Sequence, residues 1–260
     1  MGPTGGALTV AARDRADLVA ALERQRAAWE QRPLVRELYR EWHGMAVGAL
    51  STTEGPVIEL GCGFGAFKEH HPLVMATDVA PTPWAETVLD AGQLDLSDRS
   101  VANLVMTDVF HHLPHPGRFL AEAERVLAPG GRVVMVEPYC SPASYPAYRL
   151  LHFEGADLRP DPFSGGALST AHPLEANNAL ATLIFWRHLR RFERVHPSLA
   201  VRTRERFAFF LYPLSGGLTG RELVPRRAVG ALGRAERALA PLAGALAFRC
   251  LVVLEKRERG

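Results

Sequence analysis

The sequence has few cysteines, almost no net charge and no long apolar segment, and each shortage argues against a class of protein. Its three cysteines, Cys62, Cys140 and Cys250, are far apart and form no Cys-x-x-Cys pair, so neither a disulfide framework nor a zinc site is indicated. Thirty Lys and Arg residues against 28 Asp and Glu residues leave a net charge of +2, too small for a general nucleic-acid-binding protein.

Targeting and membrane signals are also scarce. Residues 1–13 contain no cationic segment followed by an apolar run and a small-residue cleavage site, so we expect no signal peptide and a cytoplasmic location. The most apolar stretch, residues 238–248, has eleven residues and is interrupted by Pro241 and Gly244. A membrane-spanning helix needs roughly 20 residues. We therefore expect this stretch to form a buried helix that leads into a strand.

The remaining composition is that of a globular protein. Hydrophobic residues make up 47% and charged residues 22% of the 260 residues, which predicts one large domain or one domain with an appendage. Apolar residues recur at helical spacing from residue 14 to residue 49, with Pro33 in the middle, so we expect two helices there. We interpret residues 1–50 as a helical cap.

Strands and helices are predicted to alternate through the rest of the chain. Residues 132–137 form a near-continuous apolar run, which is typical of a parallel strand covered on both faces. Alternation of this kind favours an α/β three-layer sandwich. The expected strands are 56–60, 73–77, 104–107, 132–137, 207–212 and 248–255, and the expected helices are one that opens at the glycine turn 61–65 and others at 116–127, 174–195 and 221–246.

Residues 138–182 show no clear periodicity and are rich in aromatic, proline and glycine residues. A stretch of this length inside a domain is usually a lid or a substrate-binding insertion. No tight metal-ligand spacing is present, so we predict no metal. The polar candidates for substrate contacts in this stretch are His152, Glu154, Asp157, His172, Glu175, Asn177 and Asn178.

Three glycines, Gly61, Gly63 and Gly65, directly follow the first expected strand. Glycines at this point let a ligand approach the backbone, although a tight strand-to-helix turn would also explain them. Glu59 lies two residues before the first glycine, where a carboxylate suits a cationic amino group and would repel a pyrophosphate. Asp78 follows the second strand, where an acidic side chain can accept hydrogen bonds from ribose hydroxyls. Together these residues indicate an adenosine-type cofactor.

Residues 57–65, VIELGCGFG, resemble motif I of the class I S-adenosylmethionine-dependent methyltransferases. Residues 107–114, TDVFHHLP, resemble the segment after strand 4 in the ubiquinone-biosynthesis-like branch (type 11), and residues 122–131, EAERVLAPGG, resemble its helix leading to strand 5. The resemblance covers about residues 55–138. It implies a Rossmann-like three-layer sandwich with a mostly parallel seven-stranded sheet, in which residues 51–260 are the methyltransferase domain with a substrate-side insertion at about residues 139–206.

The resemblance also implies S-adenosylmethionine as the cofactor. Glu59 and the backbone of Gly61 and Gly63 would hold the methionine moiety, and Asp78 would hold the ribose. The implied cofactor-binding residues are Glu59, Gly61, Gly63, Gly65, Asp78, Val79, Asp95, Thr107 and Asp108, with Val79 and Asp95 on the adenine side.

Two histidines are the first candidates for chemistry. By resemblance His111 follows strand 4 at the methyl end of the cofactor, and a histidine has a pKa suited to removing a proton from an acceptor. His112 is a second candidate, and Tyr139 lies where the substrate would approach. Asp108 would orient the histidine or contact the amino group of the cofactor. The alternative for either histidine is a structural role, bonded to loop backbone.

We expect the acceptor to be a small molecule or biosynthetic intermediate, with an oxygen nucleophile favoured by frequency. The arginine-rich segment 186–206 is either a solvated face or a docking surface for an anionic or lipid-linked substrate. Two other functions stay open. Gly61, Gly63 and Ala66 also satisfy the loose fingerprint of a nicotinamide-dependent oxidoreductase, and the chain could be a non-catalytic S-adenosylmethionine-binding partner subunit.

Overall fold

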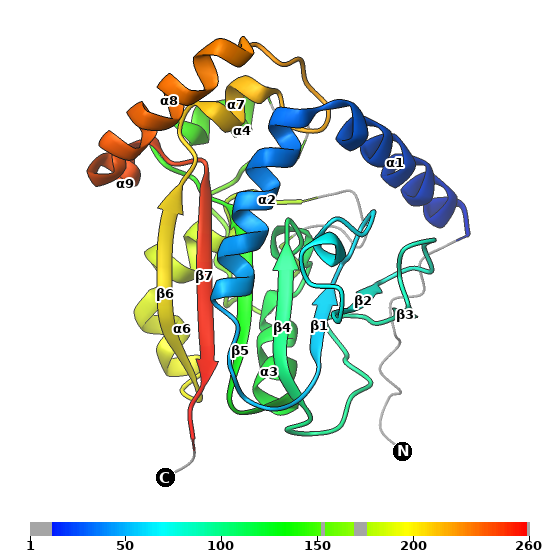
Figure 1. The fold of residues 1–260 in the computed structure, drawn as a ribbon. Helices are drawn as coiled ribbons and strands as arrows, with labels where there is room; N and C mark the ends of the chain where they lie inside the picture. Colours follow the sequence, from blue (N-terminus) through cyan, green and yellow to red (C-terminus); the bar gives the residue numbers. More distant parts are fainter. Residues whose placement is uncertain (1–11, 152–153, 169–175, 259–260) are drawn as a thin grey trace.

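A computed structural model describes residues 12–151, 154–168 and 176–258. Its centre is a seven-stranded sheet in the order β3-β2-β1-β4-β5-β7-β6, in which β7 alone runs antiparallel to its neighbours (Figure 1). The mostly parallel α/β sheet predicted from the sequence is therefore confirmed. The strands are β1 (Val57–Leu60), β2 (Met75–Asp78), β3 (Thr87–Val88), β4 (Val101–Thr107), β5 (Leu127–Pro138), β6 (Leu199–Phe207) and β7 (Arg249–Lys256).

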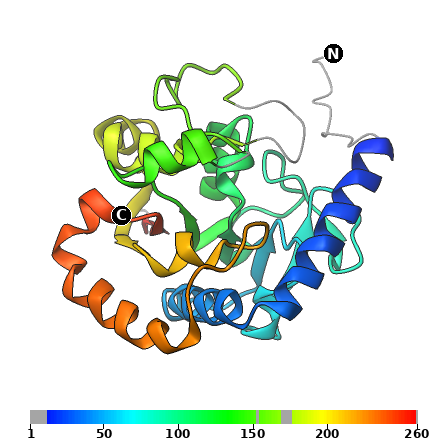
Figure 2. The same cartoon turned by 90° about the horizontal axis from the view of Figure 1, so that it is seen from above.

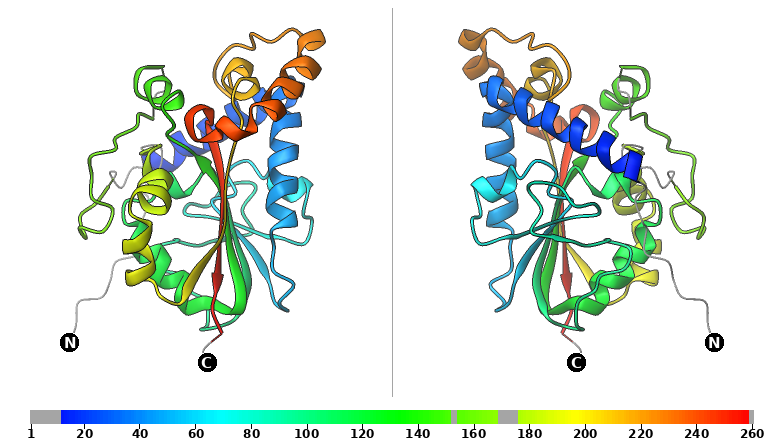
Figure 3. Two further views of the ribbon diagram at one scale, coloured as in Figure 1. Left: turned by 90° about the vertical axis from the view of Figure 1, so that its left-hand side faces the viewer. Right: turned by 90° about the vertical axis from the view of Figure 1, so that its right-hand side faces the viewer.

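Helices cover both faces of the sheet, as Figure 3 shows edge-on. Helices α1 (Ala12–Gln31) and α2 (Pro33–Gly48) meet at Pro33, as expected, because proline is tolerated in the first turn of a helix but not in its interior. The fully buried Trp42 of α2 belongs to one core with Val105, Val134 and Val253 of the central strands. Helix α2 is thus a layer of the sandwich as well as part of the N-terminal segment.

The other face of the sheet carries α3 (Pro116–Val126) and α6 (Leu189–Val195). Their core is aromatic, with Phe110, Phe119, Phe185 and Phe192 all buried. Residues 101–106 of β4 and 133–138 of β5 are also buried, which agrees with the apolar runs expected for strands covered on both sides.

The helix expected after the glycine turn is absent, and only a 3₁₀ turn, Phe67–Glu69, precedes β2. The reason is chain length. Nine residues separate Gly65 from Met75, and they must both leave β1 and return to the start of β2. Pro72 shortens any helix further because it cannot continue one. The glycine turn therefore closes directly onto the sheet.

Two other expectations are wrong in position. The strand predicted at 207–212 is instead β6, and Leu211–Ser215 forms a short helix, α7. Arginines alternate along β6, which is an edge strand with one solvated side, so its pattern resembled a basic face more than a strand. The helix predicted at 174–195 is divided into α5 (Leu180–Thr182), a π-helical turn (Leu183–Arg187) and α6, while residues 174–175 lie outside the described part.

Short helices gather above the carboxyl ends of the parallel strands (Figures 1 and 2). They are α4 (Ser144–Leu151), α7, α8 (Arg226–Ala238) and α9 (Ala243–Leu246), with a 3₁₀ turn at Ala240–Leu242. The buried helix expected at 238–248 is wrong, because neither the turn nor α9 buries a residue and Leu242 is 52% exposed. Among the described residues, no helix combines the length and apolarity that crossing a membrane requires.

Candidate active site

A cavity of about 450 Å³ lies at the carboxyl ends of the parallel strands. This is the place where ligands bind in open α/β sheets. Its walls come from the turn after β1, the segment after β4, helices α1 and α4, and residues 216–220 after α7. The polar and backbone groups that matter below are Glu59, Gly61, Gly63, Thr107, Asp108, His111, His112, Glu154 and Arg249, all of which line it.

The turn after β1 needs glycine at Gly61. Gly61 has φ +70°, and a Cβ placed on it would lie 2.6 Å from the side chain of Val109. The end of β2 holds the turn: the Cys62 amide donates to the Thr77 carbonyl at 2.8 Å, and the Gly63 amide donates to Asp78 Oδ2 at 3.1 Å. The close approach therefore fixes the glycine turn against the loop that follows β4.

Glu59 is buried beside this turn and is 3% exposed. Its Oε2 atom has no hydrogen-bond partner among the described residues. Burial, and secondarily the negative charge of Asp78, raise the pKa of Glu59 to about 8. A buried polar atom without a partner is costly unless a ligand satisfies it. An ammonium group would do so, and the α-amino group of S-adenosylmethionine fits this requirement.

The segment after β4 is shaped by one carboxylate, that of the fully buried Glu137 at the end of β5. Its Oε1 accepts hydrogen bonds from the amides of Val109 and Phe110 at 2.9 and 2.8 Å. Its Oε2 lies 2.6 Å from His111 Nδ1. Asp108 takes the left-handed conformation at φ 58° just before this segment. Glu137 thereby fixes both the 3₁₀ turn Phe110–His112 and the orientation of the His111 ring.

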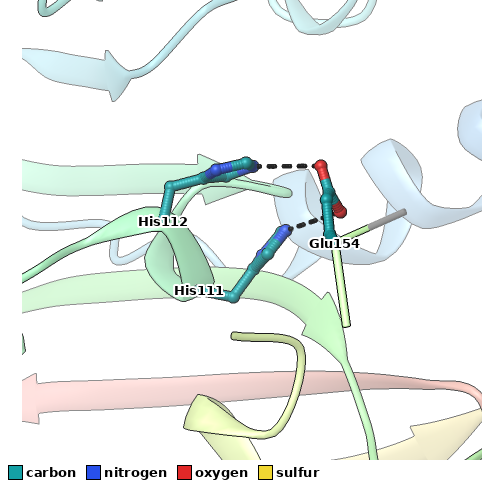
Figure 4. Close-up of side chains that lie close together, drawn as sticks. All are labelled: His111, His112 and Glu154. Atoms are coloured by element: carbon teal, nitrogen blue, oxygen red, sulfur yellow. Dashed lines mark ion pairs between the residues drawn. The ribbon is translucent and has the colours of Figure 1, made fainter. Parts of the chain in front are cut away.

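Glu154 faces both histidines (Figure 4). His111 Nε2 and His112 Nε2 each lie 3.6 Å from an oxygen of its carboxylate. The two imidazole rings are 4.3 Å apart between centroids. Burial lowers the pKa of His111, but the carboxylates of Glu137 and Glu154 outweigh it and raise that pKa to about 10. His111 is therefore an imidazolium between two carboxylates at neutral pH when nothing else is bound.

An ion pair between the buried Arg249 and the partly exposed Asp108 forms the floor of the cavity. The Arg249 guanidinium donates to Asp108 Oδ1, and the Tyr39 hydroxyl donates to Asp108 Oδ2 at 2.8 Å. Although burial opposes it, the charges of Arg249 and His111 lower the pKa of Asp108. Arg249 is 1% exposed and lies 4.8 Å from the ring centroid of Trp42, a cation–π contact. Asp108 thus has two partners already, as one expects of a positioning group.

Some predicted site residues lie outside the cavity wall. Asp95 is in an exposed loop between β3 and β4. Tyr139 is buried, with its ring 4.8 Å from that of Trp186 and beside Arg206. Gly65, Asp78 and Val79 do not line the cavity; a Cβ placed on Gly65 would lie 3.3 Å from Trp84, and Asp78 holds the glycine turn.

Two residues of the site were missed from the sequence, Glu137 and Arg249. The available signal for Glu137 was a charged residue at the end of an apolar strand. The signal for Arg249 was a charged residue at the start of one. Glu154 was only one of seven polar candidates in the insertion. Of those seven, Asn178 also lines the cavity, and His152, His172 and Glu175 lie outside the described residues.

The sheet and its helices form the Rossmann-like fold of the class I S-adenosylmethionine-dependent methyltransferases. Residues 58–135 match the model of the methyltransferase domain family, which is similar to this segment of the chain. S-adenosylmethionine is the cofactor of the class. A search of curated protein sequences gives no match.

Solved structures resemble the whole chain in fold at low sequence identity. One is a complex between the Trm112 methyltransferase activator of Haloferax volcanii and a methyltransferase, with 17% identity, a TM-score of 0.52 and coverage of 96% of this chain and 99% of that one. Another is geranyl diphosphate C-methyltransferase from Streptomyces coelicolor A3(2), with 14% identity, a TM-score of 0.53 and coverage of 96% and 100%. A geranyl diphosphate methyltransferase bound to S-adenosylmethionine has 16% identity, a TM-score of 0.50 and coverage of 86% and 89%.

Proposed function

We propose that this protein transfers a methyl group from S-adenosylmethionine to an oxygen atom of a small-molecule acceptor. One observation carries the proposal: the partnerless carboxyl oxygen of Glu59 and the His111, His112 and Glu154 side chains line the same cavity. A volume of about 450 Å³ is in the range of ligand pockets for small molecules. S-adenosylmethionine supplies an electrophilic methyl group when it is bound.

The residues of the glycine turn would hold the cofactor. Glu59 would accept hydrogen bonds from the ammonium of the methionine moiety, and the backbone of Gly61 and Gly63 would approach it closely. Thr107 and Asp108 would bound the same end. The predicted contacts of Asp78 with the ribose, and of Val79 and Asp95 with the adenine, are retained as predictions, of which Asp78 is the most directly testable.

Proton removal from the acceptor is assigned to the histidine side of the cavity. Glu137 holds His111 Nδ1, so Nε2 is the atom of His111 that would take the proton, once it has passed the proton that it carries in the free protein to Glu154. Glu154 competes for that atom at 3.6 Å and would have to yield to the acceptor. His112 lies beside it and is the second candidate. Nothing in the contacts of Tyr139 supports a catalytic role for it.

Two flanking segments would enclose the ligands. Leu18, Leu22 and Gln25 of α1 line the cavity from the N-terminal cap, residues 1–50. The insertion, about residues 139–206, contributes Tyr148 and Glu154. Exclusion of water by such covering segments favours methyl transfer over side reactions. We therefore propose that the two segments close the methyltransferase domain over cofactor and acceptor.

The arginines of segment 186–206 favour the solvated-face interpretation over a docking surface. Most of them donate hydrogen bonds within this chain, and Arg191 and Arg202 pair with carboxylates, so these side chains are already held by their own surface. The contacts are Arg187 to the Leu158 carbonyl, Arg191 to Asp161, Arg202 to Glu255, Arg204 to the Phe185 carbonyl and Arg206 to the Tyr139 hydroxyl.

Calorimetric titration tests the proposal. S-adenosylmethionine and S-adenosylhomocysteine should bind, NADPH should not, and Glu59→Gln should weaken binding of the first two. Glu54→Gln, which changes an exposed carboxylate before β1, is the matched control and should leave affinity unchanged. Binding of NADPH alone would support the oxidoreductase alternative. Cofactor binding without turnover across an acceptor panel of phenols, enols and alcohols would support the partner-subunit alternative.

A further inference from the structure

The side chains of His111, His112 and Glu154 converge on one point of the cavity wall (Figure 4). We propose that these three residues form a binding site for one divalent transition-metal ion. No metal was predicted from the sequence, because the ligands come from two segments more than forty positions apart in the chain. The fold brings them together by laying the insertion over the segment that follows β4.

The distances suit a shared ion. Each residue offers one ligand atom, and the three atoms lie within 4.8 Å of one another. Both Nε2 atoms are 3.6 Å from an oxygen of Glu154. Two ligands that are each about 2.1 Å from one ion are separated by about 3.0 to 3.4 Å in octahedral and tetrahedral geometry. The nitrogen–oxygen separations would have to shorten by a few tenths of an ångström, and the two nitrogens, which are at most 4.8 Å apart, by up to about 1.4 Å to reach tetrahedral geometry.

Glu137 prepares His111 for this role. Its carboxylate lies 2.6 Å from Nδ1, so Nδ1 keeps its hydrogen when an ion displaces the proton from Nε2, and the Nε2 lone pair is then directed at the cluster. A carboxylate behind a ligating histidine is the usual arrangement around protein-bound metals, because it fixes the ring and raises its basicity. Glu137 does not ligate the ion itself, since its oxygens already accept the amides of Val109, Phe110 and His111.

The ligand set selects the kind of ion. Two imidazole nitrogens and one carboxylate suit Zn²⁺, Fe²⁺, Co²⁺ or Mn²⁺, whereas Mg²⁺ and Ca²⁺ prefer oxygen ligands throughout. Three protein ligands leave at least one position open, which is typical of sites that take a further ligand. An oxygen anion of the acceptor would fill that position. This last step rests on the proposed function, but binding of the ion does not.

The metal site and the general-base role of His111 exclude each other, because a nitrogen bound to an ion cannot accept a proton. In the metal-bound protein, His111 and His112 would be ligands that hold the acceptor oxygen opposite the methyl donor. The two hypotheses differ in a property that is measured without any acceptor, namely the metal content of the protein.

The test uses the full chain without a histidine tag, freed of metal with a chelator and dialysed against Zn²⁺, Co²⁺ or Mn²⁺ separately. Mass spectrometry of the bound metal should give one ion per chain for at least one of the three metals, and Co²⁺ should produce visible absorption bands. His112→Ala and Glu154→Gln should each weaken binding by about tenfold or more. His115→Ala, in the same segment but outside the cluster, should bind as the parent protein does.

The variants change half-buried side chains, and their thermal melting shows whether they are folded. Absence of a stoichiometric ion for all three metals, or equal binding by the His112→Ala/Glu154→Gln double variant, would overturn the metal site. S-adenosylmethionine is titrated into the same samples. Normal cofactor binding without an ion overturns the metal site alone, and a bound ion without cofactor binding overturns the proposed function alone.

Discussion

Glu137 Oε2 lies 2.6 Å from His111 Nδ1 while the same carboxylate accepts the amides of Val109 and Phe110. One fully buried side chain thus links the end of β5 to the loop after β4 and to the imidazole that faces the cavity. A carboxylate has four lone-pair sites, so it can serve all of these donors at once. The orientation of His111 is consequently a property of the sheet rather than of a free loop.

Glu137→Gln should destabilise the protein. The amide keeps the size of the side chain but replaces one acceptor oxygen with a donor, which leaves a buried group on the loop unsatisfied. We expect the free energy of unfolding, measured by urea denaturation, to fall by about 1–3 kcal/mol. Glu86→Gln removes an exposed pair with Lys68 and should cost much less, because surface ion pairs contribute little to stability. Equal losses in the two variants would show that Glu137 does not hold the loop.

Cofactor affinity should depend on pH through Glu59. Its pKa in the free protein is about 8, so below that value the side chain must lose a proton before it can pair with an ammonium. Affinity for S-adenosylmethionine should rise up to about tenfold per pH unit between about pH 6 and pH 7.5, above which the α-amino group of the ligand itself begins to titrate. Calorimetry at several pH values measures this slope, and Glu59→Gln should flatten it.

The same group gives a stability signature of opposite sign. Because the folded-state pKa of Glu59 is raised above its ordinary value near 4.5, the free protein binds more protons folded than unfolded between those two values. Its contribution to stability is therefore complete below about pH 4.5 and is lost as the pH rises towards 8. The melting temperature of the free protein, relative to Glu59→Gln, should fall over that window. A constant difference would contradict the raised pKa.

Asp78→Asn should weaken cofactor binding by about 1–3 kcal/mol if the carboxylate accepts hydrogen bonds from the ribose. Asp78 also holds the Gly63 amide, so loss of affinity alone is ambiguous. A 2′,3′-dideoxy analogue of S-adenosylhomocysteine resolves the two roles. With a ribose contact, the parent protein should bind the analogue more weakly than S-adenosylhomocysteine and Asp78→Asn should bind both alike. An equal preference in both proteins would assign Asp78 to the turn alone.

Gly61→Ala should be destabilising for two separable reasons. The left-handed backbone disfavours a Cβ by about 1–2 kcal/mol, and the new methyl group would meet Val109 at 2.6 Å. Overpacking of this kind costs a further 1–3 kcal/mol, roughly. Adding Val109→Ala should restore the steric part and leave the backbone part. Denaturant unfolding of the two single variants and the double variant measures the coupling, and strict additivity would disprove the contact.

The central strands and the glycine turn could be predicted because their signals are local. The apolar run 132–137 predicts a strand, and the glycines at 61, 63 and 65 predict a turn, from neighbouring residues alone. Both are found where expected. The helix after the turn was wrong because chain length, not residue preference, decides that connection. Strand β6 was misplaced because alternating arginines on an edge strand resemble a solvated basic face.

The acceptor side of the site could be predicted only in part. His111 and His112 were chosen by resemblance of a short motif, and both line the cavity. Their partners Glu137 and Glu154 are 26 and 43 positions from His111. The insertion has no periodicity from which its path could be inferred, so the meeting of Glu154 with the two rings depends on tertiary packing alone.

The antiparallel strand β7 has a consequence for how the molecule folds. It delivers Arg249 to Asp108, a partner 141 positions earlier in the chain. We expect contacts between residues so distant in sequence to form late, because closing the long loop between them costs conformational entropy before the contact can stabilise the chain. We expect the cavity floor to form only once β7 has paired with β5. A ligand seated above it binds the finished fold only, and stabilises that state by mass action.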